Sequence, residues 1–159
     1  MGTDGAYVIV KASKKVIVTA YTLTTGNDNV SWGGRNPKSW VFSGCNDYDE
    51  ANVNSGSWQA IDTRTDDTTM KDVNRQPYTF GCKNTEVYQY YKLQVSAVQG
   101  EGGELLQIGE LGFTYEDPYN VSFTALDGTQ TSTNEGYAKL IDGNINTKWG
   151  VSGFSSAYI

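Results

Sequence analysis

The clearest pattern in the chain is a strict alternation of hydrophobic and polar residues between positions 90 and 98. Tyr, Leu, Val and Ala occupy the odd positions from 91 to 97, and Lys, Gln and Ser occupy the even positions between them. A period of two places apolar side chains on one face of a β-strand and leaves the other face to solvent. The stretch therefore predicts a strand that covers a core on one side.

Similar patterns predict further strands and the loops between them. Residues 15–24 form the second clear strand pattern, shorter ones occur at 39–43, 59–63, 77–80 and 107–115, and 137–141 is predicted as a single helical turn. The intervening stretches 24–37, 46–57 and 65–76 are rich in Asn, Asp, Gly and Thr, which favour turns. An all-β antiparallel sandwich follows, with binding chemistry expected in the long loops.

Composition narrows the class of protein. A chain of 159 residues fits one domain with a single core, and 18 glycines with 13% aromatic residues suit short strands and many turns. Twelve basic residues against eighteen acidic ones give a net charge of −6, which argues against a nucleic-acid partner. No apolar run approaches the roughly 18 residues of a membrane span, and binding to acidic lipid would need basic surroundings that are absent.

Several residue types that carry catalysis are missing or unpaired. The chain has no histidine, the commonest zinc ligand and the usual general base at neutral pH. No Asp or Glu pair lies in a motif that would separate two carboxyl pKa values, so an enzyme is not expected. The two cysteines, Cys45 and Cys82, allow either one disulfide or two free thiols, because sequence spacing does not fix their proximity.

Several spaced motifs carry a family resemblance. In chain order they are Thr22–Asp28, Gly34–Trp40, Ser43–Asp47, Ser57–Asp62, Tyr90–Leu93 and Leu106–Leu111. Together they resemble the discoidin or coagulation factor 5/8 type C domains, and in particular the carbohydrate-binding members. The resemblance covers nearly the whole chain. It implies an eight-stranded antiparallel jelly-roll β-sandwich of the galactose-binding-like type, without catalytic activity, secreted or displayed at the cell surface as part of a larger protein.

The order of segments departs from that family. Asp142–Trp149 resembles the usual beginning of such a domain, so residues 5–114 would supply the later strands, 115–120 a junction, and 121–159 the opening strand and a calcium loop. An Ala-Tyr strand follows this loop in the family, and it occurs here at both ends of the sequence. This order fits a circularly permuted domain. It also fits a sequence cut off-register from tandem repeats, so that it starts inside one repeat and ends inside the next. The short tether favours a monomer, with a strand-swapped oligomer as the alternative.

The resemblance also implies a structural calcium ion. Asp142, Asn144 and Thr147 of the loop would bind it, together with Glu110 from the last strand and the carbonyl of Leu140. Ca²⁺ prefers about six to eight oxygen ligands, which such a turn can supply. The alternative is that the Asp, Gly and Asn residues simply form a turn and that Glu110 is a solvated strand residue.

A glycan site needs a flat aromatic surface and a few planar polar groups. Trp32, in a glycine-flanked loop, is the predicted aromatic platform, although it could instead anchor the loop by packing. Arg35 and Asn36 follow it, and for Arg35 the alternative is an ion pair with Asp28. Further ligand-binding residues predicted to reach the same end of the sandwich are Tyr48, Asn52, Asn54 and Arg75.

The other three tryptophans, Trp40, Trp58 and Trp149, are predicted to lie in the core because they belong to strand patterns or end the calcium loop. The function expected is that of a calcium-stabilised, non-catalytic carbohydrate-binding module that targets a secreted enzyme or adhesin to glycans. The alternative is a structural or adhesive repeat that binds protein partners or assembles by strand exchange. Residue types do not name the sugar, because loop geometry sets specificity.

Overall fold

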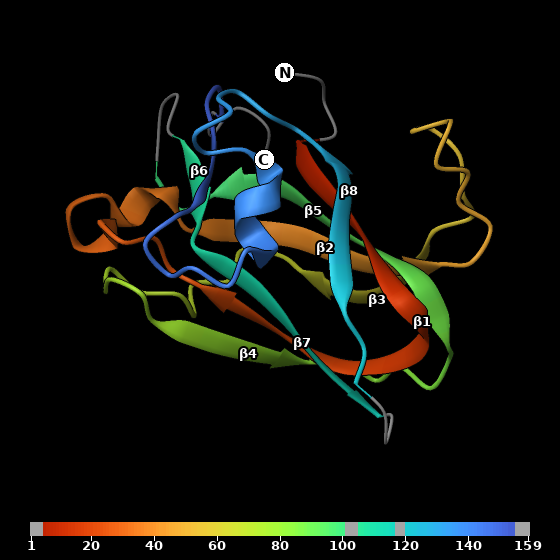
Figure 1. Ribbon diagram of the computed structural model, residues 1–159. Helices are drawn as coiled ribbons and strands as arrows, with labels where there is room; N and C mark the ends of the chain where they lie inside the picture. The colour runs from red at the N-terminus through yellow and green to blue at the C-terminus, as the bar shows by residue number, and fades with distance from the viewer. Residues whose placement is uncertain (1–4, 101–104, 117–119, 155–159) are drawn as a thin grey trace.

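The computed structural model describes residues 5–100, 105–116 and 120–154, and it has two packed β-layers (Figure 1). The strands are β1 (Ala6–Thr24), β2 (Pro37–Cys45), β3 (Gln59–Arg64), β4 (Pro77–Gly81), β5 (Tyr88–Val98), β6 (Leu106–Ile108), β7 (Glu110–Glu116), β8 (Phe123–Gly128) and β9 (Trp149–Val151). Three 3-10 turns lie between them: η1 (Asn29–Ser31), η2 (Gly33–Arg35) and η3 (Tyr137–Ile141). The predicted all-β antiparallel sandwich is confirmed. In the described part of the chain no helix has the length and hydropathy to cross a membrane.

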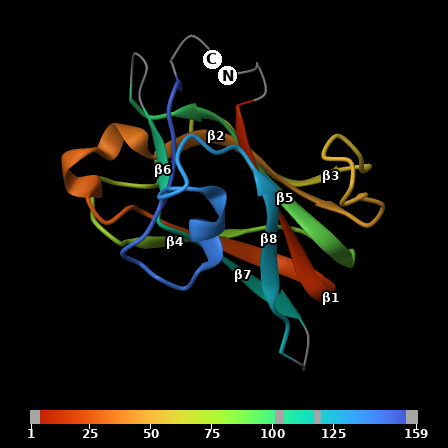
Figure 2. The same cartoon turned by 45° about the horizontal axis from the view of Figure 1, so that its top comes forward.

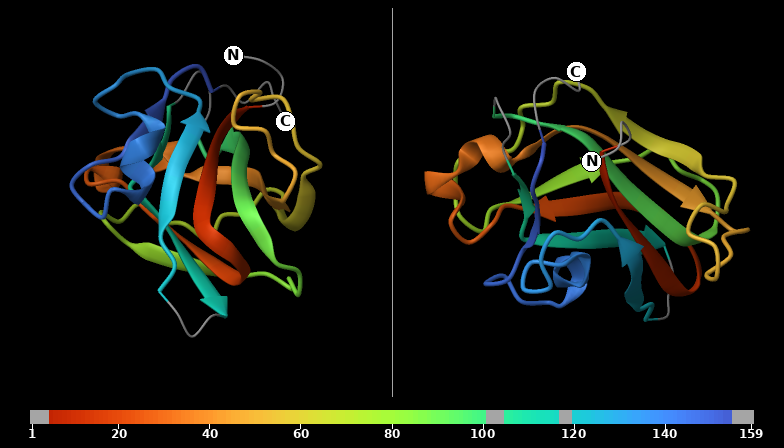
Figure 3. Two further views of the ribbon diagram at one scale, coloured as in Figure 1. Left: turned by 45° about the vertical axis from the view of Figure 1, so that its right-hand side comes forward. Right: turned by 90° about the horizontal axis from the view of Figure 1, so that it is seen from above.

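Strand β1 belongs to both layers. Its first half lies between β5 and β8, so that one layer has the order β3-β2-β5-β1-β8, as the left view of Figure 3 shows for its last three strands. Its second half lies between β4 and β7 in the other layer. The pairing of β1 with β5 shifts register between Lys11 and Val16, where the strand bends. A single strand therefore turns the corner of the sandwich, where the sequence predicted a separate strand over 15–24.

The core lies between the two layers and is rich in aromatic rings. Tyr21 of the smaller layer contacts Phe42 of the larger layer, with ring centroids 4.5 Å apart. Trp40 contacts Phe80 edge-on at 5.1 Å. The odd residues of β5 from Tyr91 to Val95 are buried, as the alternating pattern predicted. Trp40 and Trp149 are also buried, in agreement with their assignment to the core.

A chain of polar contacts crosses this core without leaving a charge unpaired. The Trp40 indole N–H donates to the Tyr21 hydroxyl at 2.7 Å, and that hydroxyl donates to Asp62 Oδ2 at 2.5 Å. Arg64 Nε donates to the same oxygen at 2.9 Å. Burial, together with the bond to Asp62, raises the pKa of Tyr21, so the phenol keeps its proton. The contacts fix the two layers relative to each other.

The described part of segment 121–159 packs on its own chain. Strand β8 pairs with β1, β9 pairs with β6, and η3 lies beside β8 (Figure 2), with Leu140 in the core. The N-terminal copy of the Ala-Tyr strand, Ala6–Val10, occupies the position between β5 and β8. The second copy, Ser156–Ile159, lies outside the described residues. The assignment of the segment order to a permutation stays a prediction.

The structure corrects the strand predicted over 107–115 and decides between a disulfide and free thiols for the two cysteines. The strand predicted over 107–115 is divided into β6 and β7 at Gly109, whose N–H donates to the carbonyl of Thr24 at 2.7 Å. A Cβ at this glycine would lie 2.6 Å from the Thr25 carbonyl oxygen, so the close approach requires glycine. The cysteines are both free thiols: Cys45 is buried on the outer face of the larger layer, whereas Cys82 packs against the main core.

Candidate functional site

Three loops meet at one end of the sandwich, which we call the Asp28 end: residues 25–36, 65–76 and 142–148. Backbone bonds join the first two, since Thr25 N–H donates to the Gln76 carbonyl and Arg75 N–H donates to the Gly26 carbonyl. The Asn27 side chain donates to the carbonyl of Asn146 at 3.0 Å and joins the third. The loops therefore form one cross-linked surface.

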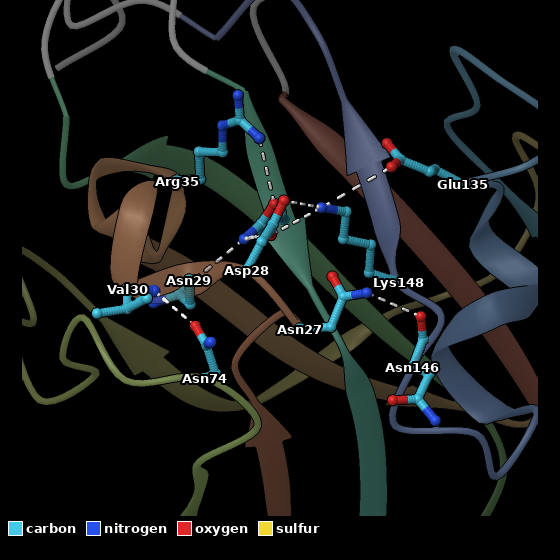
Figure 4. A network of polar contacts seen from close by, with 10 residues as sticks. Asn27, Asp28, Asn29, Val30, Arg35, Asn74, Glu135, Asn146 and Lys148 are labelled. Carbon is cyan, nitrogen blue, oxygen red and sulfur yellow. Dashed lines mark hydrogen bonds and ion pairs between the residues drawn. The ribbon is translucent and has the colours of Figure 1, made fainter.

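Asp28 is the centre of a network of polar contacts at this end (Figure 4). The Lys148 ammonium lies 2.8 Å from both oxygens of its carboxylate, and Gln107 Nε2 donates to Oδ1 at 2.9 Å. Glu135 is a second, more distant partner of Lys148 at 3.9 Å. Burial acts to raise the pKa of Asp28, but the bond and charge of Lys148 outweigh it, and the pKa is lowered. Asp28 is therefore held as an anion.

Arg35 and Trp32 form a stacked pair next to this network. The guanidinium carbon of Arg35 lies 4.3 Å from the centroid of the Trp32 ring. Arg35 Nη1 also approaches Gln107 Oε1 at 3.4 Å, so Gln107 bridges Arg35 and Asp28. The expected alternative for Arg35, an ion pair with Asp28, is not formed, because Lys148 occupies that position. Trp32 is 49% exposed, so it is not the packed anchor that was its alternative role.

The other two predicted residues of this end have different surroundings. Asn36 is fully buried and donates to the Lys71 carbonyl at 3.2 Å, so a bound ligand does not reach it in this arrangement. Arg75 is exposed and donates to Asn146 Oδ1 from Nε at 3.2 Å and from Nη2 at 2.9 Å. Its backbone has φ of 54°, in the left-handed region that non-glycine residues rarely adopt. Arg75 is thus a fixed, solvent-facing cation beside the network.

A cavity of about 280 Å³ opens at the Asp28 end. Its lining residues are all of polar types and come from three separate parts of the chain. They are Asn27, Asp28, Asn134, Glu135, Asn146, Thr147 and Lys148. The amides and carboxylates can donate to and accept from hydroxyl groups. Gln107 and Arg35 connect Asp28 in this lining to the exposed Trp32 ring. This combination can bind a polyhydroxylated molecule.

Tyr48, Asn52 and Asn54 do not join the Asp28 end, and this part of the prediction needs correction. They lie on loop 46–57, which follows β2 at the far end of that strand from the η1 and η2 turns (Figure 1). A nine-residue strand spans about 30 Å, and the two loops flank this one strand, so they must lie at its opposite ends. Tyr48 is also largely buried, against Trp58 and Tyr90.

Two residues of interest were missed from the sequence. Lys148 is buried, lies 120 residues from Asp28 in the sequence, and holds the central carboxylate. The one feature of the sequence that could have indicated its burial is that it directly precedes a core tryptophan, Trp149. Trp58, predicted to be core, is half-buried and lines a second cavity on the outer face of the larger layer. The preceding Gly56-Ser57 pair marked Trp58 as part of a loop rather than of a strand.

The residues predicted to bind calcium come together around a tight turn. Thr147 Oγ1 donates to Asp142 at 2.8 Å, and Asn144 N–H donates to the same carboxylate at 2.9 Å. Glu110 of β7 lies close to the Asp142 carboxylate and to the backbone N–H groups of Gly143 and Asn144. The side chain of Leu140 packs in the core, and nothing further is observed of its carbonyl.

The electrostatics of this turn are those of two carboxylates at close range. Burial, followed by the bond to Asp142 and its charge, raises the pKa of Glu110 to about 7. The pKa of Asp142 is lowered, because bonds from Thr147 and Asn144 outweigh burial.

Glu110 Oε1 is buried and accepts no hydrogen bond from the described residues. The described ranges contain no cluster of three or more His, Cys, Asp and Glu side chains, so a cation here would also need hydroxyl or carbonyl oxygens. The orphaned oxygen and the all-oxygen donor set fit Ca²⁺.

The two antiparallel layers, with polar loops gathered at one end, define a β-sandwich domain. No protein-family model and no curated protein matches the sequence. Among solved structures, the chain is similar to the family 32 carbohydrate-binding module of EndoD from Streptococcus pneumoniae, with a TM-score of 0.51 and 12% identity over 69% of each chain. At this identity the likeness shows the fold alone: the chain shares the β-sandwich fold of that module.

Proposed function

We propose that the chain is a non-catalytic carbohydrate-binding module whose ligand binds at the Asp28 end. The observation that carries the proposal is the exposed Trp32 ring, which Arg35 holds by stacking while Gln107 holds Arg35. A flat ring in a fixed orientation covers the apolar C–H face of a pyranose. The cavity at the same end of the sandwich supplies amides and carboxylates for the hydroxyl groups. The shared fold with a carbohydrate-binding module supports this class of ligand.

Binding at this site is expected to be weak. The ring is half-exposed and the cavity is small, so only a few ligand atoms lose contact with water. Shallow sites of this kind give dissociation constants of roughly 10⁻⁵ to 10⁻³ M. We propose that the module sits in a secreted or cell-surface protein, where several copies or a linked enzyme would raise the effective affinity.

The test is a glycan-array screen followed by calorimetry on the strongest hit. Trp32→Ala should abolish binding and change the melting temperature little, because the ring makes few core contacts. Val30→Ala is the matched control, since Val30 is an exposed apolar side chain, 63% accessible, in the same loop, and its loss should leave affinity unchanged. Unaltered binding by Trp32→Ala would reject the site.

A structural Ca²⁺ ion forms the second part of the proposal. Glu110 and Asp142 would hold the ion through their side chains, with Thr147 and Asn144 contributing further oxygens. The buried, unpartnered oxygen of Glu110 supports this assignment. The ion would offset the repulsion between the two carboxylates and link β7 to the turn after η3.

The alternative function, a repeat that assembles through strand exchange, rests on the two copies of the Ala-Tyr strand in the sequence. A strand without a position in its own sheet can pair with the edge of another chain. In the structure, Ala6–Val10 fills the position between β5 and β8 of its own chain. This leaves no open position there for a strand from another chain, so we favour the binding module.

A further inference from the structure

The cavity at the Asp28 end has more negative than positive charge in its lining. Asp28 and Glu135 carry carboxylates, and Lys148 is the one basic residue among the described residues that line it. The other lining residues are uncharged amides and a threonine. The whole chain carries −6, so the wider surroundings do not reverse this excess. The cavity therefore favours a cationic ligand over an acidic one.

The Lys148 ammonium is already engaged by Asp28. It lies 2.8 Å from both oxygens of the carboxylate, and its side chain is largely buried. Gln107 Nε2 adds a further bond to Asp28 Oδ1 at 2.9 Å. The charges of Asp28 and Lys148 thus offset each other within the wall of the cavity. The excess negative charge is that of Glu135.

Glu135 has a weaker partner and is open to solvent. Its Oε1 lies 3.9 Å from the Lys148 ammonium, which is longer than a hydrogen bond, and its side chain is 44% exposed. Figure 4 shows the ammonium between the two carboxylates, with Glu135 on the side away from Asp28. The backbone of Glu135 is fixed, since its carbonyl accepts from the Gly150 N–H at 2.9 Å. The carboxylate is therefore placed at the cavity and remains accessible to a ligand.

The wall also contains an acceptor that lacks a donor. The Asn27 amide donates to the Asn146 carbonyl at 3.0 Å, but its Oδ1 is buried and accepts no hydrogen bond from the described residues. Buried polar atoms are normally paired, so this oxygen marks a position where a donor is missing. Together with Glu135 it makes the cavity rich in acceptors. An ammonium group, with three N–H donors and no acceptor, complements such a site.

Charged groups just outside the lining are of both signs. Arg75 contacts the lining through Asn146, whose Oδ1 it holds from Nε at 3.2 Å and from Nη2 at 2.9 Å. Asp142 contacts the lining through Thr147, whose hydroxyl donates to it at 2.8 Å. One cation and one anion thus lie a single residue away from the cavity. They leave the excess charge of Glu135 in place.

From these observations we propose that the Asp28 end selects amino sugars, and that its ligand is an oligosaccharide of 2-amino-2-deoxyhexoses with protonated amines. An amine pairs with Glu135, hydroxyl groups bond to the amides of Asn134 and Asn146, and a further sugar unit contacts Trp32. The inference rests on the proposed function, because it names the class of glycan for the same site. Acetylation of the amine removes its charge, so the N-acetylated sugar loses the charge-assisted contact.

The test compares two ligands that differ only in acetylation, triglucosamine and its triacetyl form. Each is titrated into the ¹⁵N-labelled full chain at low ionic strength, in a mildly acidic buffer that keeps the amines protonated. We expect saturable amide shifts at Asn134, Glu135 and Asn146. The amine form should bind about fivefold or more tightly than the triacetyl form, as for one partly screened charge pair.

Two variants test the part played by Glu135. Glu135→Gln keeps the shape of the side chain and removes its charge, so the two ligands should then bind equally. Glu116→Gln removes the same charge at an exposed position of β7 outside the cavity and should keep the preference. If Glu135→Gln lowers the melting temperature, a salt titration of the parent chain replaces it. The preference should then shrink as ionic strength rises.

Several outcomes would overturn the amine preference. They are equal affinity of the parent chain for the two ligands, tighter binding of the triacetyl form, and a preference that persists in Glu135→Gln or does not change with salt. Spermidine, which has amines without sugar rings, tests for simple attraction by the net charge. If it shifts the same amides with the affinity of triglucosamine, the assignment to an amino sugar is wrong.

Failure of the amine preference is distinguishable from failure of the proposed function. If the two ligands bind equally and Trp32→Ala abolishes the binding of both, the preference is refuted and the glycan site stands. If neither ligand nor any glycan of the array screen shifts the amides of the Asp28 end, both are refuted.

Discussion

Replacing Glu110 by Gln should stabilise the calcium-free protein and at the same time remove its response to calcium. The pKa of Glu110 is raised from 4.5 to about 7 in the fold, mainly by burial and then by Asp142. At about 1.4 kcal/mol per pKa unit, an ionised Glu110 at pH 8 would cost up to roughly 3 kcal/mol. Because the group is partly open to solvent, screening reduces this to about 1–2 kcal/mol. The amide has nearly the same shape and carries no charge.

The sign of the pH dependence follows from the raised pKa. Without calcium, the parent chain should gain stability as pH falls from about 7 to 4.5, because the folded state binds a proton that the unfolded state does not. In chelator at pH 8, Glu110→Gln should melt about 2–8 °C higher, at roughly 2–4 °C per kcal/mol for this size. Added calcium should stabilise the parent chain by mass action and leave the variant unchanged.

Thermal melts followed by circular dichroism are run at pH 5 and pH 8, in chelator and in calcium. They give the pH dependence of the parent chain, the melting-temperature difference between parent and variant in chelator, and the calcium response of each protein. Glu116→Gln is the control: it lies on the same strand, is exposed, and should alter neither the melting temperature in chelator nor the calcium response. A Glu110→Gln protein that melts lower than the parent in chelator would refute the electrostatic reasoning. A calcium shift that persists in this variant would instead refute the role of Glu110 as a ligand.

Three further predictions concern the rest of the fold. Lys148→Ala removes the cation beside the Asp28 carboxylate and should cost about 1–2 kcal/mol in chemical denaturation, because the Asp28 side chain is 40% exposed and keeps its bond from Gln107. Lys83→Ala at an exposed position should cost nothing measurable. Gly56→Ala should cost about 1–3 kcal/mol, because φ is 98° and the new methyl group meets the Trp58 indole; Gly81→Ala, with open space around it, is the control. Light scattering should give the mass of one chain at micromolar concentration, and a dimer that persists on dilution would favour strand exchange.

Much of the fold could be predicted because period-two patterns report directly on burial. The β5 stretch is the clearest case, since its alternate residues face the core as the pattern required. The continuous course of β1 could not be predicted, because Ser13-Lys14-Lys15 interrupts its alternation and resembles a turn. The pattern fixes which face a residue occupies and not whether a strand bends into a second layer.

The candidate site was only partly predictable, for a related reason. Trp32 stood out locally because a large aromatic residue in a glycine-flanked loop has no obvious role in the core. The partner of Asp28 depends on which cation the fold brings close, and Lys148 lies 120 residues away. Loop 46–57 was assigned to the wrong end although it and loop 25–36 flank the same strand, β2, and therefore lie at its opposite ends.

The sharing of β1 by both layers has a consequence for synthesis of the protein on the ribosome. The first half of β1 pairs with β8, and the contact between Tyr7 and Asp127 joins residues 120 positions apart. At translation rates of about 5–20 residues per second, one edge of β1 stays unpaired for on the order of 6–24 s, until β8 has been synthesised. During that interval an unpaired strand rich in Val and Ile is exposed to other nascent chains. We therefore expect this edge of β1 to be prone to association with other chains until β8 has been synthesised.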